Sequence, residues 1–145
     1  MLLHRQPRRG VTLVECAIIY PLTLLLLLGI LIGGLGIFRY QQVASLAREG
    51  ARYASVRGAK YAQTVPGATA ATQADVYNNA IKPRLVMLDE SRLNCTQSGV
   101  NWVTWPDGDN SQGSRVQVTV SYNWVPEAFL GGITLSSTST MTISY

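Results

Sequence analysis

The fold of this chain is decided by residues 16–38, which read CAIIYPLTLLLLLGILIGGLGIF and contain no charged side chain. A helix of about 20 apolar residues crosses the hydrocarbon core of a bilayer. The rival interpretation is a cleavable secretory signal, whose apolar region runs for only about 7–15 residues before a small-residue cleavage site. The present run is longer and is followed by Arg39 and Tyr40, so it predicts a retained transmembrane helix over residues 11–38.

Charge is distributed unevenly around this apolar run. The 145 residues carry 12 basic and 8 acidic side chains, which gives a net charge of +4. Arg5, Arg8 and Arg9 precede the span, and a second basic group follows it within residues 39–60. Without residues 1–10 the chain would keep nine basic residues against eight acidic ones. The basic balance therefore belongs mainly to the start of the chain, and we expect no nucleic-acid partner.

Helical periodicity continues beyond the span. Alanine recurs at three- and four-residue spacing at Ala44, Ala47, Ala51 and Ala54. Glu49 is flanked by Arg48 and Arg52, which is typical of an exposed helix face. One helix is therefore predicted from near Val11 to the high fifties. Its length of about 65 Å far exceeds the ~30 Å hydrocarbon core, so residues 39–60 must continue outside the membrane.

The remainder, residues 61–145, has the pattern of a small head. Residues 61–74 surround a Pro-Gly pair and predict a loop, and residues 72–81 predict a short helix stopped by Pro83. Three segments then alternate with a period of two, at residues 100–104, 116–124 and 134–145. Trp102, Trp105 and Trp124 are expected in the core of the sheet, with an exposed pair that forms a surface for a partner as the alternative.

The expected architecture is α+β. Three strands make a small, mostly antiparallel sheet with one apolar face, and that face needs a cover. The alanine-rich outer part of the long helix is the available cover. The fold class is therefore a long N-terminal transmembrane and stalk helix packed on a small antiparallel β-sheet head, as in pilin-like proteins.

Two interpretations apply to the segment Arg8-Arg9-Gly10-Val11-Thr12-Leu13-Val14-Glu15. In the first, Glu15 reaches the lipid headgroups from the end of the span and has no special role. In the second, cleavage after Gly10 exposes an α-amino group on Val11, which is largely cationic at neutral pH. Glu15 of an adjacent, axially offset subunit would neutralise that amine and set the register between helices, while apolar packing supplies the cohesion.

Three residues within the span bear on helix packing. Pro21 removes a backbone donor and is expected to bend or loosen the helix. Gly29 and Gly33 form a G-x-x-x-G motif, which lets helices approach closely. These positions are candidates for contacts between subunits.

The two cysteines lie in different parts of the chain. Cys16 falls at membrane depth and Cys95 in the head, so we expect no disulfide between them. Two interpretations remain open for Cys95: a buried small apolar residue, or one end of an intermolecular bridge.

Patterns typical of enzymes are not found in the sequence. The only histidine is His4, which argues against a histidine-based triad or metal site. There is no phosphate-binding glycine loop and no acid–base constellation. We expect no catalytic residues, no metal site and no cofactor.

Residues 8–57 resemble the TadE-like minor pilins (pseudopilins) of the bacterial tight-adherence, or Tad/Flp, type IV pilus system. The resemblance rests on Arg9-Gly10, Val14-Glu15, Pro21, the leucine run at residues 24–28 with Gly29, Gln41-Gln42 and the sequence AREGARYA at residues 47–54. Cys16 stands where the family usually has an aromatic residue after the glutamate.

This resemblance implies a leader, residues 1–10, that a prepilin peptidase removes between Gly10 and Val11. It implies a minor pilin of the inner membrane or the extracellular pilus, active in pilus assembly, adherence and biofilm formation. Its partners would be the major and other minor pilin subunits and the inner-membrane assembly platform. A ten-residue tail before the span fits a cytoplasmic N-terminus and a periplasmic head. The alternative is a single-pass membrane-anchored binding or adhesin-like module that is neither cleaved nor polymerised.

Overall fold

The computed structural model describes residues 9–126 and 131–144. The chain divides into two compact units, Met1–Leu35 and Gly36–Tyr145. Most of the expected leader lies outside the described residues, because within residues 1–10 the description covers only the backbone of Arg9 and Gly10.

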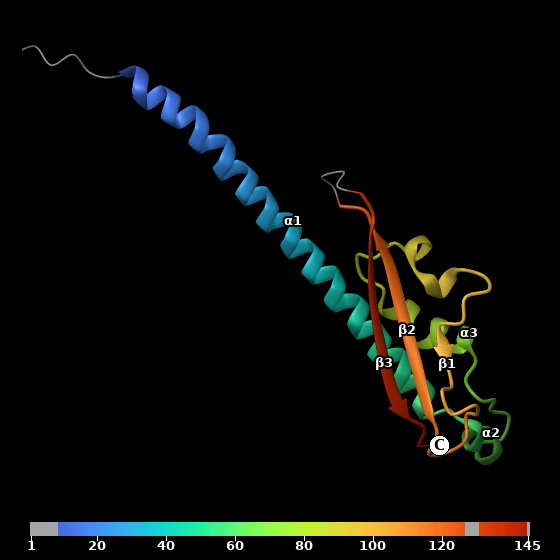
Figure 1. Cartoon of the computed structure of the whole chain (residues 1–145). Coiled ribbons are helices and arrows are strands. Elements are labelled where there is room, and N and C mark those ends of the chain that lie inside the picture. The colour runs from blue at the N-terminus through green and yellow to red at the C-terminus, as the bar shows by residue number, and fades with distance from the viewer. Residues whose placement is uncertain (1–8, 127–130, 145) are drawn as a thin grey trace, which may run out of the picture. The chain divides into compact units, whose positions relative to one another are not determined.

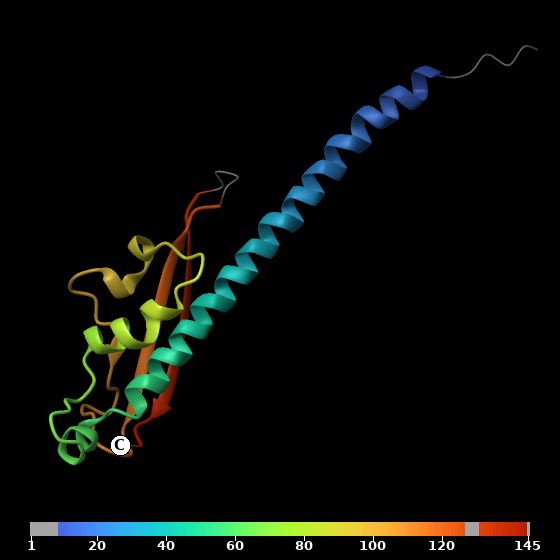
Figure 2. The same ribbon diagram turned by 180° about the vertical axis from the view of Figure 1, so that it is seen from behind.

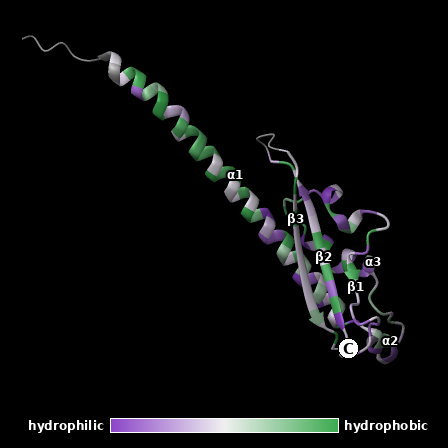
Figure 3. Cartoon of the chain, viewed as in Figure 1, coloured by the Kyte–Doolittle hydropathy of each residue, from purple (hydrophilic) through white to green (hydrophobic). Residues whose placement is uncertain are grey.

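The first unit consists of the start of helix α1, which extends over Arg9–Ser55 (Figure 1). The sequence predicted that the helix starts near Val11, and it begins two residues earlier, at Arg9. It runs without interruption through Pro21. Apolar side chains are exposed along most of this part of the helix, whose colouring in Figure 3 is mainly hydrophobic with a few polar interruptions. Leu13 and Tyr20, for example, are 72% and 70% exposed. A helix that is apolar all round is stable only inside other apolar matter, which in this sequence means lipid or other helices.

The second unit begins with the outer part of α1, which is amphipathic. Five apolar side chains at three- and four-residue spacing are buried on one face: Val43, Leu46, Ala47, Ala51 and Ala54. Small residues on that face let the helix backbone lie close to the sheet (Figure 2). The prediction that the alanine-rich half of the helix covers the sheet is thereby confirmed.

The sheet has three strands: β1 (Val103–Thr104), β2 (Arg115–Trp124) and β3 (Ile133–Thr142). Their spatial order is β1-β2-β3 and both pairings are antiparallel. The α+β class and the antiparallel sheet agree with the sequence pattern. β1 is shorter than the predicted segment at residues 100–104, although Trp102 still accepts a hydrogen bond from Thr119 through its backbone carbonyl (2.8 Å).

Strand β2 forms the centre of the core. Its alternate side chains are buried in the order predicted from the period of two: Val116, Val118, Val120, Tyr122 and Trp124. On the opposite face, hydroxyl groups form cross-strand pairs at 2.9 Å, one between Thr119 and Thr138 and one between Ser121 and Ser136. This polar face explains why β3 can be rich in serine and threonine.

The connection between helix and sheet differs from the prediction in one place. Residues 61–74 were expected to be a loop, but the helical turn α2 covers Ala59–Thr64. The helix expected at residues 72–81 is present as α3 (Gln73–Val76) and a π-helical turn η1 (Tyr77–Ile81), with Thr72 and Asp75 forming a capping box. Pro83 does not end the helical conformation abruptly. After η1 the chain continues through a short 3₁₀ turn, η2 (Lys82–Arg84), which contains Pro83. Proline is tolerated at such a position because the first turn leaves its backbone N–H groups unpaired anyway.

Two further 3₁₀ turns, η3 (Glu90–Arg92) and η4 (Asn94–Thr96), lead to the sheet. They lie along the β1 side of β2, since Leu93 forms an isolated antiparallel bridge with Tyr122. At the end of the chain, β3 stops at Thr142 and Ile143 is buried. The last residue of the predicted strand, Tyr145, lies outside the described residues.

Candidate functional site

The predicted processing site falls in the first turn of α1. Gly10 is exposed, and no heavy atom of the described residues lies within 4 Å of a Cβ built on it. Val11 is helical. The structure therefore places the two residues at the beginning of the apolar helix, which is where a cut would turn the helix end into a free α-amino terminus.

Glu15 is exposed on α1, four residues after Val11. Residues four apart lie on the same face of a helix, about 6 Å along its axis. Glu15 is the only charged residue between Thr12 and Phe38. The carboxylate therefore belongs to an otherwise apolar helix surface, where an ionised group is costly without a partner.

The predicted packing glycines are open to a neighbour. No heavy atom lies within 4 Å of a Cβ built on Gly29, Gly33 or Gly34. Gly29 and Gly33 share one face of the helix by their spacing. Within the first unit, the described residues therefore leave room at this small-residue surface for the backbone of a neighbouring helix.

Two other glycines of α1 have a role that the sequence pattern did not reveal. A Cβ at Gly36 would lie 2.7 Å from Cζ3 of Trp124, and a Cβ at Gly50 would lie 3.0 Å from Cγ1 of Val118. Both glycines let the helix backbone touch β2. The available signal was the cost of glycine inside a helix, about 1 kcal/mol, which usually implies a packing reason. Gly50 lies within the AREGARYA sequence, so that part of the resemblance corresponds to a helix–sheet contact.

Arg39 marks the point where α1 becomes polar. Its guanidinium donates a hydrogen bond to the hydroxyl of Tyr122 at 3.2 Å and lies 5.8 Å from the ring centroid of Trp124. A cation over an aromatic face is attracted by the ring quadrupole. The first charged side chain after the apolar run is therefore held by the end of β2.

The basic stretch of the helix is not a simple exposed face. Glu49 lies 3.5 Å from Arg84 of η2 and is therefore in contact with another element, whereas the sequence predicted an exposed helix face there. Arg57, just after the helix, stacks on Tyr53 with 4.0 Å between its Cζ atom and the ring centroid. The partly exposed Glu49–Arg84 pair contributes little to stability, but it ties η2 to the helix.

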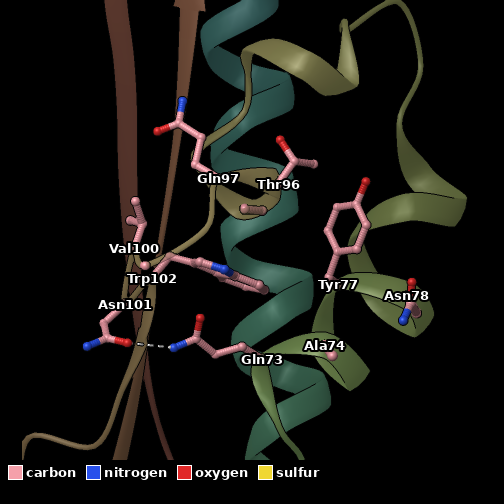
Figure 4. A pocket seen from close by; sticks show the side chains of 11 residues that line it. Gln73, Ala74, Tyr77, Asn78, Thr96, Gln97, Val100, Asn101 and Trp102 are labelled. Carbon is pink, nitrogen blue, oxygen red and sulfur yellow. Dashed lines mark hydrogen bonds between the residues drawn. The ribbon is translucent and has the colours of Figure 1, made fainter.

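The head contains a shallow cleft between α3 and the segment leading to β1 (Figure 4). Trp102 lines it, and Gln73 donates a hydrogen bond to Asn101 at 3.1 Å across one end. Tyr77 donates to the carboxylate of Glu90. Burial, and then this hydrogen bond, raise the pKa of Tyr77 well above its usual value. The phenol is thus a fixed donor in the cleft at neutral pH.

Cys95 also lines this cleft, and both cysteines of the chain are free. The Cys95 thiol donates to the side-chain oxygen of Asn94 at 3.3 Å. Burial raises the pKa of Cys95 to about 12. The thiol is therefore protonated at neutral pH, and it is a half-buried, weakly polar group at the wall of the cleft.

The acidic turn after β1 is an internally paired loop. Asp107 accepts three hydrogen bonds from Arg115. The donors are the backbone N–H at 2.8 Å, Nε at 3.1 Å and Nη2 at 2.7 Å. Asp109 accepts from the hydroxyls of Ser111 and Ser114. These donors lower the pKa of both carboxyl groups. Among the described residues, no three histidine, cysteine or acidic side chains are grouped so that they could hold a metal ion.

The geometry defines a class of protein: one N-terminal helix, long and apolar enough to span a membrane, joined to a small α+β head. Its apolar window has a mean hydropathy of 2.5 and is not buried by the rest of the chain. Such a helix fits a membrane-anchored component.

Residues 10–52 match the family model described as TadE-like protein. The match confirms, over these residues, the resemblance to TadE-like proteins of the Tad pilus system that the sequence showed. The match covers less than half of the chain, and over those residues the chain is similar to TadE-like proteins. No curated protein and no solved structure matches the chain.

Proposed function

We propose that this protein is a minor pilin, or pseudopilin, of a Tad/Flp-type pilus, made as a precursor and cleaved by a prepilin peptidase after Gly10. The observation that carries the proposal is the extent of the TadE-like match. It begins at Gly10, covers the whole apolar part of α1 and ends at Arg52, within the part of the helix that packs on the sheet.

Cleavage would prepare the helix end for assembly. Removal of residues 1–10 takes away Arg5, Arg8 and Arg9 and leaves the Val11 amine at the beginning of an apolar helix. That amine and the Glu15 carboxylate of an offset neighbour would form a charge pair in a medium of low dielectric constant. A pair of this kind is best suited to fixing register, because its desolvation cost offsets much of its attraction.

Apolar contact between helices would supply most of the cohesion. The exposed leucine-rich surface of residues 24–28 and the open Gly29–Gly33 face support this, since small residues allow close helix approach. The partners would be major and other minor pilin subunits and the inner-membrane assembly platform. The head would be periplasmic and the leader cytoplasmic, and the protein would contribute to adherence and biofilm formation through the pilus, without catalysis of its own.

The direct experiment measures the intact mass of the protein extracted from membranes of cells that express the prepilin peptidase. We expect the mass to be that of residues 11–145. Cells without the peptidase should yield the full chain, and so should a Gly10→Val variant. A full-length mass in the presence of the peptidase would favour the anchored binding or adhesin-like module.

A second experiment separates cleavage from assembly. Glu15→Gln should be cleaved normally but should lower the amount of pilus recovered by shearing, because the neutral amide cannot balance the Val11 amine. Glu49→Gln is the matched control, because Glu49 lies outside the span and pairs with Arg84 in the head. Equal pilus yields from the two variants would contradict a register role for Glu15.

A further inference from the structure

Exposed apolar side chains in the second unit gather toward one end. Ten large apolar side chains are exposed among its described residues. Three belong to α1 itself at the end of the uncharged run: Ile37, Phe38 and Tyr40. Four others form what we call the apolar rim: Val86, Met87, Val125 and Ile133, with exposed fractions of 60%, 77%, 42% and 47%. The remaining three, Val56, Val65 and Val100, lie elsewhere.

Two glycine contacts fix the level of Val125 and Ile133 along the helix. Gly50 lies against Val118 and Gly36 lies against Trp124. The two glycines are separated by about 21 Å of helix, and the two β2 residues by about 20 Å of strand. β2 therefore runs beside α1 in the opposite direction, and Trp124 lies at the level of Gly36. Its strand partner is Ile133, and Val125 follows it in the chain.

This level coincides with the end of the apolar run. Gly36 precedes Phe38, the last uncharged residue before Arg39, by about 3 Å along the helix. If the hydrocarbon boundary lies where the uncharged run ends, Val125 and Ile133 lie at that boundary. Figures 1 and 2 show this end of β2 and β3 at the opposite end of the head from α2 and the C-terminus.

The other half of the rim is held at nearly the same level by an independent contact. The side-chain amide of Gln42 donates a hydrogen bond to the carbonyl of Val86 at 2.8 Å. Gln42 lies about 6 Å beyond Phe38 along the helix. With the hydrocarbon boundary at the end of the uncharged run, that is the depth of the headgroup layer. Met87 has a φ of 60°, a left-handed conformation that costs a non-glycine residue about 1–2 kcal/mol. The chain thus holds an exposed methionine in a strained turn directly after the residue that Gln42 contacts.

Among the described residues near the rim, the charged side chains do not oppose contact with lipid; Glu127, which follows Val125 by two residues, lies outside them. Arg39 is cationic and suits anionic headgroups. Two acidic residues of the neighbouring turns are already paired, Asp89 with Arg92 at 3.5 Å and Glu90 with Lys82 at 3.6 Å. An apolar rim with cations beside it is the composition of surfaces that settle into the boundary between headgroups and acyl chains.

We propose that the apolar rim is a lipid-contacting surface, which seats the head on the bilayer that α1 enters. The proposal rests on the membrane anchoring in the proposed function. Trp124 is buried between Gly36 and Arg39, and this contact sets the depth of the head relative to the bilayer. The rim side chains enter the interfacial layer. The head is then held to the membrane at the span and at the rim, so its orientation before assembly is restricted.

The test uses the full chain reconstituted in vesicles of phosphatidylethanolamine with phosphatidylglycerol as the minor anionic component. Single cysteines carrying an environment-sensitive fluorophore are placed by Met87→Cys, Val125→Cys, Val65→Cys or Leu25→Cys, each with Cys16→Ala and Cys95→Ala. Shallow-spin-labelled lipids quench a probe in the interface, and iodide quenches one in water. Circular dichroism before reconstitution confirms that each labelled variant is folded.

We expect the probes at positions 87 and 125 to be quenched by lipid several-fold more strongly than the probe at position 65. That probe is the matched control, because Val65 is also an exposed valine but follows α2 at the far end of the head. Strong iodide quenching at positions 87 and 125, with lipid quenching retained at position 25, would overturn the rim proposal and leave the anchor intact. Loss of lipid quenching at position 25 would instead refute the anchoring itself.

Discussion

The indole of Trp124 lies directly on Gly36, so closely that a Cβ at residue 36 would be 2.7 Å from Cζ3 and 3.0 Å from Cη2. Contacts of that length do not occur between real side chains, and the indole is 4% exposed and has little room to move. The contact joins the first residue of the second unit to the last residue of β2. Alanine at residue 36 would crowd this close contact, and the effect should be measurable.

Gly36→Ala should destabilise the head. Alanine favours the helix by about 1 kcal/mol over glycine, but overpacking against a fixed ring costs about 1–3 kcal/mol. We expect a net loss of about 1 kcal/mol in the free energy of unfolding, measured in detergent micelles by denaturant titration with tryptophan fluorescence. Gly34→Ala is the control, because no heavy atom lies near a Cβ there. A Gly36→Ala protein as stable as the control would show that the ring moves away freely.

Gly50→Ala should be destabilising for a similar reason at a different site. Its Cβ would lie 3.0 Å from Val118 and 3.3 Å from Val76, both of which are fully buried. Adding Val118→Ala provides the missing space, so the double variant should lose less stability than the sum of the two single changes. Non-additivity of this kind is the signature of direct contact. Strict additivity of the two losses would argue against the contact.

The loop after β1 should be sensitive to acid. Hydrogen bonds from Arg115 lower the pKa of Asp107 below its usual 3.8, so the ionised carboxylate stabilises the folded state above that value. The stabilisation is lost as the pH falls from about 4 through the lower folded-state pKa. Asp107→Asn should therefore lower the melting temperature at neutral pH but much less at about pH 3. A difference that is the same at both pH values would mean that the ionised form has no special role.

Cys95 should react slowly with alkylating reagents. Burial raises its pKa from 9.0 to about 12, which reduces the thiolate fraction at pH 8 on the order of a thousandfold. In a Cys16→Ala background, iodoacetamide labelling of the folded chain should be slow and should accelerate as the pH approaches 12. The same chain in urea provides the unprotected rate. Rapid labelling of the folded protein near neutral pH would favour the alternative in which Cys95 is available for an intermolecular bridge.

Much of the architecture could be predicted because its causes are local. The uncharged run of residues 16–38 requires an apolar environment whatever the rest of the chain does. The alternation in β2 places Val116, Val118 and Val120 on one face by strand geometry alone. The alanine spacing in the outer helix similarly marks the side that meets the sheet. The assembly roles of Gly10, Glu15 and Gly29 stay predictions, and they too were drawn from position within one helix.

Contacts between distant segments could not be predicted in this way. The short helix α2, the pairing of Glu49 with Arg84 and the reach of Gln42 to Val86 depend on which surfaces meet after folding. The β1 strand shortened to two residues because the neighbouring turns, rather than further strand, occupy that side of β2. Local propensity is a weak constraint where tertiary packing determines the outcome.

The sequence by itself determined that this protein has a membrane-compatible helix with a carboxylate near its start, and a small antiparallel head. Only the tertiary structure decided that Gly36 and Gly50 serve packing between the helix and β2. It also decided that the rim residues, which are scattered along the chain, lie at the level where the helix becomes polar. The physical reason is that periodicity fixes which face a side chain occupies, whereas contacts over long sequence separations fix what that face meets.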